Sequence, residues 1–236
     1  MAGALPSAGP PRGLFVTGTD TGVGKTVVAA AMVAALRARG VPVRALKPLI
    51  TGLDDPSDPV WPADHELLAQ AAGHDPDEVK LLGYGPAVSP HLAAELSGVP
   101  VRTEELERRV LAARRDGEQL IVEGVGGLLV PIAPGYDVRA LAAALDLPVV
   151  VVARPGLGTI NHTLLTLEAA RSAGLRVLGV VLNPWPADPD AIERSNRNTI
   201  ERLAGVAVSG LPRLEAPDPE ALAGAGAALP LDDWLS

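Results

Sequence analysis

Short apolar runs alternate with longer helix-forming segments along most of this chain. The run at residues 148–153 is almost continuously apolar, which is typical of a strand in a parallel sheet that helices cover on both faces. The regular alternation predicts an α/β domain with a mainly parallel sheet between two layers of helices. We predict strands at residues 14–17, 41–48, 119–123, 148–153, 176–183 and 206–211, and helices at residues 27–36, 64–73, 89–96, 103–111, 161–173 and 188–203.

Three stretches fall outside this alternation. Residues 1–12 have neither a charged start nor a long apolar core, so we expect a flexible tail and assign residues 13–236 to a single domain. Residues 51–62 form a polar loop rich in Pro and Asp, and a loop of this length indicates a function or disorder. From about Glu215 onward the chain is rich in Ala, Gly and Pro, and we expect this end to be peripheral.

The stretch Gly18-Thr19-Asp20-Thr21-Gly22-Val23-Gly24-Lys25-Thr26 lies between the first strand and the first helix. A strand, a Gly-rich turn with Gly-Lys-Thr and a helix form the context of a phosphate-binding P-loop, in which Lys25 would reach the outer phosphates and Thr26 would contact Mg²⁺. Five residues separate Gly18 from Gly24, one more than in the usual pattern. A Gly-rich turn with an incidental lysine is the alternative. The context favours nucleotide binding and a P-loop NTPase-type three-layer fold.

Polar residues stand where several predicted strands end, which is where ligands bind in open α/β sheets. Glu123 ends the third strand, where a Mg²⁺-binding carboxylate of the Walker B type belongs. Lys47 ends the second strand and either contacts phosphate or extends over the surface. Asp64 is either a ligand or the N-cap of a helix, and Asn183, which precedes a proline, either contacts a ligand or shapes a turn. Arg154 stands at a further strand end.

The composition narrows the classes of function. Of the 236 residues, 47% are hydrophobic and only 3% are aromatic, so Val, Leu and Ala must fill the core. The net charge of −8 argues against a nucleic acid or an anionic membrane as partner, and no apolar run has the length of a transmembrane helix. There is no Cys and the four His lack metal-ligand spacing, so we expect a cytoplasmic enzyme without thiol chemistry or a histidine metal centre.

Taken together, these motifs resemble those of the dethiobiotin synthetases, a family of biotin biosynthesis. The matching segments run in the family's order from about residue 14 to residue 215, and the long Gly-rich loop is itself a mark of the family. Gly22 stands where some members have Glu, Val125 where Ala is common, and Thr51 where Ser is frequent. The matching segments are residues 18–26, 47–48, 51–52, 64, 89–95, 122–128, 157–163 and 182–183.

The resemblance implies a reaction and its cofactor. In that family 7,8-diaminononanoate, CO₂ and ATP give dethiobiotin, ADP and phosphate in the presence of Mg²⁺. One amine takes up CO₂ as a carbamate, the carbamate attacks the γ-phosphate to form a mixed anhydride, and the second amine closes the ureido ring. Gly22 removes a carboxylate near the phosphates, which leaves another nucleoside triphosphate open as the donor.

The resemblance also implies site residues and a homodimer. Lys25, Lys47 and Thr21 would be catalytic, and the helix start at residues 158–161 would come from the neighbouring subunit and bind the carboxylate of the diamine. By similarity, the nucleotide site comprises Gly22, Val23, Gly24, Lys25, Thr26, Asn183 and Pro212; the substrate site comprises Lys47, Thr51, Gly126, Gly158, Thr159, Ile160 and Asn161; and the Mg²⁺ ligands are Thr26, Asp64 and Glu123.

Two other classes of protein share parts of this pattern. A ParA/MinD-like switch ATPase, whose hydrolysis drives partner or membrane binding, has the same fold but a lysine early in the loop, where this chain has Asp20. An amidotransferase synthetase of the cobyrinate type needs a nucleophilic Cys, which this chain lacks. ATP turnover that depends on the diamine would indicate the synthetase, and turnover stimulated by protein or lipid would indicate the switch.

Overall fold

A sheet of seven parallel strands runs through the part of the chain that this computed structural model describes, residues 13–56 and 58–236. The strand order is β3-β2-β4-β1-β7-β8-β9, so β1, which leads into the Gly-rich loop, lies at the centre. The expected tail at residues 1–12 lies outside the described residues. The strands are β1 (Gly13–Gly18), β2 (Val43–Ile50), β3 (Lys80–Gly83), β4 (Gln119–Gly127), β7 (Val149–Ala153), β8 (Val177–Trp185) and β9 (Ala207–Pro212), with β5 (Pro131–Ala133) and β6 (Tyr136–Asp137) as a separate antiparallel pair.

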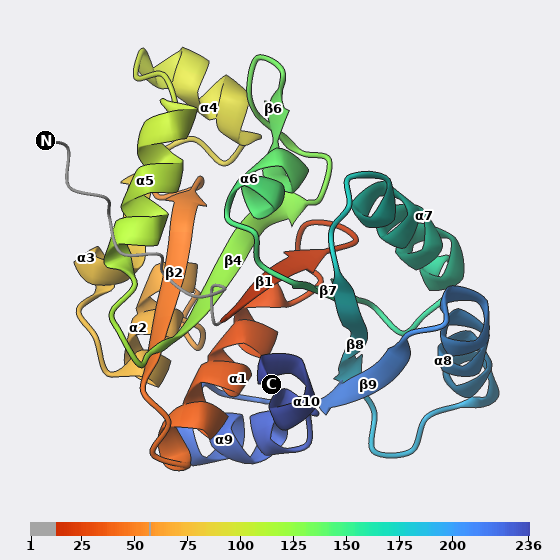
Figure 1. Ribbon diagram of the computed structural model, residues 1–236. Coiled ribbons are helices and arrows are strands. Elements are labelled where there is room, and N and C mark those ends of the chain that lie inside the picture. Colours follow the sequence, from red (N-terminus) through yellow and green to blue (C-terminus); the bar gives the residue numbers. More distant parts are fainter. Residues whose placement is uncertain (1–12, 57) are drawn as a thin grey trace, which may run out of the picture.

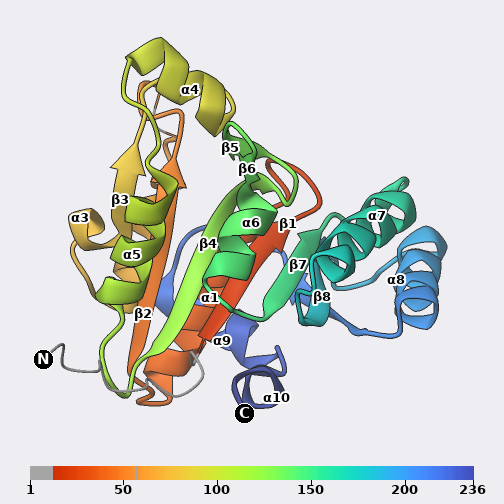
Figure 2. The same cartoon turned by 45° about the horizontal axis from the view of Figure 1, so that its top comes forward.

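Helices cover both faces of the sheet (Figures 1 and 2), which confirms the three-layer α/β fold. The apolar side chains divide between two cores, one beneath each layer of helices. One layer holds α1 (Lys25–Ala38), α2 (Asp64–Ala72), α3 (Pro76–Val79), α9 (Pro219–Ala227) and α10 (Leu231–Leu235), and the other holds α4 (Pro90–Ser97), α5 (Thr103–Ala113), α6 (Val138–Ala144), α7 (Thr159–Ser172) and α8 (Ala191–Ala204).

Successive side chains along each strand point to opposite cores. Ala45 of β2 and Ile121 of β4 lie in the core beneath α1, whereas Leu46 lies in the other core. Side chains two residues apart on a strand share a face. Lys47 and Glu123, each two residues further along, therefore point toward the layer that holds α1 and α2.

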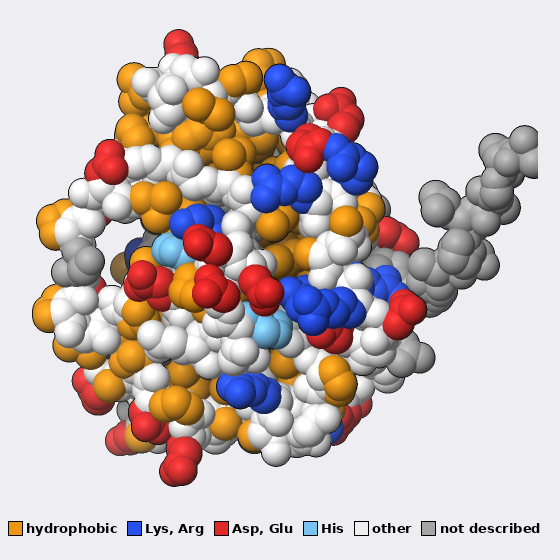
Figure 3. Space-filling view, turned by 90° about the vertical axis from the view of Figure 1, so that its left-hand side faces the viewer, with side chains coloured by type: hydrophobic (Ala, Val, Ile, Leu, Met, Phe, Trp, Pro, Cys, Tyr) orange, Lys and Arg blue, Asp and Glu red, His pale blue; other side chains and the backbone are white. Residues whose placement is uncertain are grey.

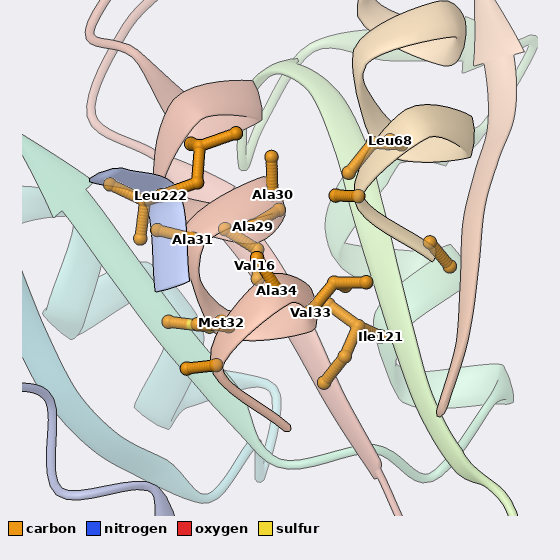
Figure 4. Close-up of a cluster of buried hydrophobic side chains, with 14 of the residues drawn as sticks. Val16, Ala29, Ala30, Ala31, Met32, Val33, Ala34, Leu68, Ile121 and Leu222 are labelled. Atoms are coloured by element: carbon orange, nitrogen blue, oxygen red, sulfur yellow. The ribbon is translucent and has the colours of Figure 1, made fainter. Parts of the chain in front are cut away.

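Helix α1 is buried on nearly all sides, and small side chains make this possible. Figure 4 shows Leu68 of α2 and Leu222 of α9 on either side of the Ala-rich helix. The contact with α9 is close: a Cβ added at Gly226 would lie 1.9 Å from the carbonyl oxygen of Ala31. The helix that follows the Gly-rich loop is therefore held rigidly between the sheet and two other helices.

The C-terminal end is not peripheral, contrary to the expectation from its composition. Leu222, Leu231 and Trp234 are buried, and they extend the core around α1. Arg39, at the end of α1, forms an ion pair with Asp232 of α10. The Ala and Gly residues that suggested a loose end are small residues at a helix–helix contact.

Strands β2 and β4 end later in the chain than the sequence predicts. Strand β2 continues past Pro48 to Ile50, because its pairing with β4 ends at Leu46 and the missing N–H of the proline breaks no bond to that strand. Strand β4 continues to Gly127, so Glu123 lies within a strand and not at its end. The short elements α3, β3, β5, β6 and α6 were not predicted.

The surface carries charges of both signs. On the face toward α3 and α5, basic and acidic side chains lie close together, and apolar side chains gather near α4 (Figure 3). Within the described ranges, no helix has the length and apolar character needed to cross a membrane.

Candidate active site

The Gly-rich loop connects the end of β1 to α1, which begins at Lys25. Two of its glycines have left-handed backbone conformations, with φ of 71° at Gly22 and 84° at Gly24. A side chain has no room at Gly24, because its Cβ would lie 2.0 Å from Nδ2 of Asn183. That Nδ2 donates a hydrogen bond of 3.1 Å to the carbonyl oxygen of Val23. Asn183, two strands away in β8, therefore supports the loop from behind.

Lys25 folds back over the loop that precedes it. Its Nζ donates a hydrogen bond of 3.0 Å to the carbonyl oxygen of Asp20, and the side chain is largely buried. Burial lowers the pKa of Lys25, and the charge of Lys47 lowers it further, while Glu123 and Asp64 act in the opposite direction. The ammonium group thus lies where an anion bound in the loop would meet it.

Lys47 lies between two carboxylates from different elements. Its Nζ is 2.8 Å from Oδ2 of Asp64 and contacts Oε1 of Glu123. The same Oε1 accepts a hydrogen bond of 2.9 Å from the hydroxyl of Thr26. The N-cap of α2 is Ala63, and Asp64 is the first helical residue, so the N-cap alternative for Asp64 was wrong. Candidate residues from the first turn of α1, from β2, from α2 and from β4 are therefore in contact with one another.

Burial and charge act in opposite directions in this cluster. Burial alone would lower the pKa of Lys47, but Glu123 and Asp64 outweigh it and raise that pKa above its ordinary value. Burial would raise the pKa of Asp64, but Lys47 outweighs it and lowers that pKa. The pKa of Glu123 is raised by its complete burial, although Lys47 opposes this. Lys47 is therefore a stable cation at neutral pH.

The residues present fit a magnesium ion. Oε2 of Glu123 is buried and has no hydrogen-bond partner among the described residues. The Thr26 hydroxyl and the Asp64 carboxylate supply further hard oxygen donors, which Mg²⁺ prefers. No three His, Asp or Glu side chains converge as metal ligands in residues 13–56 and 58–236. An ion here would need oxygen atoms from a phosphate or from water to complete its coordination.

A cavity of about 680 Å³ opens over these residues, a size typical of small-molecule sites. Lys25, Lys47 and Glu123 line its polar part. Ile50 and Trp61 line an apolar part, although the sequence gave no reason to single them out. The cavity can therefore accept phosphate groups beside an aliphatic chain.

Thr21, Thr51 and Gly126, three of the site residues expected from the sequence, line the same cavity. Thr51 directly follows β2, and Gly126 lies near the end of β4 with a φ of 61°. A Cβ at Gly126 would lie 2.8 Å from Cγ2 of Val130 and 3.6 Å from Oγ1 of Thr21. A glycine at this position keeps the wall of the cavity open.

Other predicted residues lie outside this cavity. Gly158, with a φ of 91°, precedes the first turn of α7, which contains Thr159, Ile160 and Asn161. Thr159 is buried and its hydroxyl is 3.4 Å from that of Thr163. None of residues 158–161 lines the cavity in this single chain. In the strand next to β8, Pro212 ends β9 and pairs with Trp185.

One contact of the loop could not be read from the sequence. Arg154 follows β7 and donates a hydrogen bond of 3.2 Å to the carbonyl oxygen of Thr21. The sequence places Arg154 at a strand end but gives no sign of its partner, because β1 and β7 lie far apart in the chain. The rule that ligand sites form where parallel strands end singles out Arg154 as a residue, but it does not identify the Gly-rich loop as its partner.

Comparison with known proteins gives a consistent family. A family model described as an AAA domain, AAA_26, matches residues 12–221. A protein named ATP-dependent dethiobiotin synthetase BioD from Bacillus licheniformis is 41% identical over 88% of this chain and 88% of its own length. Proteins of the same name from Haloferax mediterranei and Anaeromyxobacter dehalogenans are 41% and 46% identical, covering 94% and 81% of this chain and 93% and 85% of their own lengths.

A solved structure supports the fold. The apo McdA of Cyanthece aligns with 91% of this chain, and 90% of its own, with a TM-score of 0.53. At 14% sequence identity this likeness concerns the fold alone.

Proposed function

This chain belongs to the family of ATP-dependent dethiobiotin synthetases, and we propose that it converts 7,8-diaminononanoate, CO₂ and ATP into dethiobiotin, ADP and phosphate. It is accordingly a ligase of biotin biosynthesis with an ATP-binding P-loop. One observation supports the proposal for the site: Lys25, Lys47 and the hydrogen-bonded pair of Thr26 and Glu123 all line one cavity beside the loop. A switch ATPase finds no such support, since the relatives that match most of the chain are named as synthetases.

The proposed reaction has three steps. One amine of the diamine attacks CO₂ and loses a proton, which gives a carbamate. A carbamate oxygen attacks the γ-phosphorus, the bond from that phosphorus to the β–γ bridging oxygen breaks, and ADP leaves. The second amine attacks the carbonyl carbon of the carbamic–phosphoric anhydride, the carbon–oxygen bond to phosphate breaks, and the ring closes with loss of a proton. No side-chain nucleophile takes part.

The side chains act by binding and charge stabilisation. Loop N–H groups at residues 22–25 and the α1 N-terminus bind phosphate oxygens, and Lys25 offsets charge on the transferred phosphoryl group. Lys47, a stable cation in the cavity, stabilises the carbamate and phosphoryl oxygens. Thr21 and Thr51 donate hydrogen bonds to substrate or phosphate. The Gly126 wall admits the substrate close to the backbone.

Magnesium belongs to the proposal. Thr26, Asp64 and Glu123 would hold it, and the unpartnered Oε2 of Glu123 supports this assignment. The ion would neutralise charge on the outer phosphates. Lys47 forms ion pairs with both Asp64 and Glu123 in this structure. The two carboxylates would therefore contact the lysine and the magnesium ion at the same time.

The proposal includes a homodimer in the cytoplasm. The start of α7, at Gly158, Thr159, Ile160 and Asn161, would bind a carboxylate in the cavity of the partner subunit. The N–H groups of Ile160 and Asn161 have no hydrogen-bond partner among the described residues, whereas that of Thr159 donates to the carbonyl oxygen of Gly156. Leu157 is 97% exposed next to this helix start, which suits a surface that a second copy covers. Asn183 and Pro212, on adjacent strands, would contact the nucleotide base.

Phosphate release by purified protein tests the proposal. We expect release from Mg²⁺-ATP and bicarbonate to require 7,8-diaminononanoate, and mass spectrometry to detect dethiobiotin. CTP and GTP in place of ATP test the nucleotide preference. No response to the diamine with any of the three nucleotides would refute the proposed function.

A further inference from the structure

Arg154 reaches over the Gly-rich loop from the neighbouring strand. Its Nη2 donates a hydrogen bond of 3.2 Å to the carbonyl oxygen of Thr21 and lies 3.4 Å from the position that a Cβ of Gly22 would take. Strand β7 lies on one side of β1, whereas β4 and β2 lie on the other. Arg154 therefore approaches the loop from the side opposite to Lys47 and Glu123.

This hydrogen bond fixes the orientation of one peptide group of the loop. A trans peptide is planar and its C=O and N–H point in opposite directions. When Arg154 holds the Thr21 carbonyl, the N–H of Gly22 must point away from the guanidinium. Gly22 lines the cavity, and its φ of 71° is one that glycine adopts without strain and can also leave easily. Without Arg154 this peptide group would be free to rotate.

Arg154 also brings a positive charge to the loop. It is exposed, and none of the ion pairs within residues 13–56 and 58–236 includes it. Gly22, its near neighbour, has no side chain that could pair with it. A guanidinium in this position can therefore interact with an anion bound in the loop.

We propose that Arg154 is a positioning residue for the nucleotide: it orients the Thr21–Gly22 peptide group with the N–H toward the phosphates, and it adds an unpaired positive charge beside them. The proposal rests on the proposed function, since it takes the anion in the loop to be a nucleotide phosphate. It assigns separate effects to the hydrogen bond and to the charge, so the two can be measured apart.

The test is the dissociation constant of Mg²⁺-ATP for three variants, measured by calorimetry at about 20 mM and about 300 mM salt. We expect Arg154→Ala to bind about tenfold more weakly than the wild type at low salt, with a smaller loss at high salt. Arg154→Gln keeps an N–H donor without the charge. It should therefore bind Mg²⁺-ATP about threefold more tightly than Arg154→Ala at low salt, and its affinity should depend less on salt than that of the wild type. Arg176→Ala is the control, because it removes the same charge just before β8, at the amino end of the strand and away from the loop. Its dissociation constant for Mg²⁺-ATP should lie within about twofold of that of the wild type.

Kinetics provide a second readout. Arg154→Ala should raise the KM for ATP and leave the KM for the diamine within about twofold, which a general loss of structure would not do. ATP affinity of Arg154→Ala equal to that of the wild type, or no recovery in Arg154→Gln, would overturn the inference. A wild type that binds ATP but makes no dethiobiotin would instead refute the proposed function and leave the comparison of variants intact.

Discussion

Lys25 and Lys47 share a cavity but have different surroundings. Lys25 contacts a backbone carbonyl, whereas Lys47 balances two carboxylates, one of them fully buried. We expect Lys25→Met and Lys47→Met each to reduce dethiobiotin formation at least about 100-fold, because each removes a cation that faces the phosphoryl group. Lys47→Met also leaves Glu123 buried without its cation, so it should lower the free energy of unfolding by about 3 kcal/mol.

Steady-state assays and urea unfolding separate these two effects. Lys80→Met is a matched control, because Lys80 pairs with Lys47 in register on β3 and its ion pair with Asp77 lies at the surface. This control should keep both activity and stability. Equal losses of stability in Lys25→Met and Lys47→Met would show that the buried ion pairs are not what distinguishes the two lysines.

His74 makes stability depend on pH. Burial lowers its pKa below the ordinary 6.5, and the charge of Arg44 lowers it further. The unfolded chain then takes up a proton at a higher pH than the folded chain, so the free energy of unfolding falls as the pH drops below about 6.5. We expect His74→Gln, which does not titrate, to lose less stability than the wild type between about pH 7.5 and about pH 5.5. Parallel stability curves in denaturant titrations would contradict this.

At the residue scale, the sequence predicts which residues are candidates for the site more readily than it predicts which of them are in contact. Lys25 and Thr26 could be predicted because strand, turn and helix are consecutive in the chain. The meeting of Lys47 with Glu123 requires β2 and β4 to be neighbours, and no local pattern contains that order. The contact of Arg154 with the loop depends in the same way on β7 lying beside β1.

At the scale of elements, Gly226 marks where α9 crosses α1. A Cβ there would lie 1.9 Å from the Ala31 carbonyl oxygen, so Gly226→Ala should lower the free energy of unfolding by about 2 kcal/mol. Gly224, in the same helix, has no neighbouring atom within 4 Å of its added Cβ. Gly224→Ala should therefore be neutral or stabilise by up to about 1 kcal/mol, because Ala favours a helix. Thermal unfolding of the pair checks this, and destabilisation by both would argue against the close contact.

The elements that could be predicted carry a clear local pattern. Strand β7 is almost continuously apolar, and the helices α1, α7 and α8 each span several turns. Helix α6 and strand β3 are too short for a period to appear, and they depend on packing against β4 and β2. The C-terminal helices were missed because a contact between small residues leaves the same composition as a loose end.

At the scale of the whole molecule, a shared site predicts complementation between inactive subunits. If residues 158–161 serve the partner's cavity, Lys47→Met and Asn161→Ala subunits should each be inactive as homodimers. Exchange of equal amounts should restore about a quarter of wild-type activity, since half of the dimers are mixed and each mixed dimer has one intact site. Mass spectrometry would verify that the subunits have exchanged. If the mixture then stayed inactive, residues 158–161 would act in the site of their own subunit or in neither site.

The contact of α9 and α10 with α1 has a consequence for folding during synthesis. The ribosome makes α1 near the beginning and its cover, residues 219–235, near the end. At about 5–20 residues per second, the apolar flank of α1 waits roughly 10–40 s for its natural covering. During that interval it is a surface on which a chaperone can act. A message cut short before residue 219 would yield a chain with a complete loop motif and a bare first helix, a mark by which proteolytic quality control can recognise it.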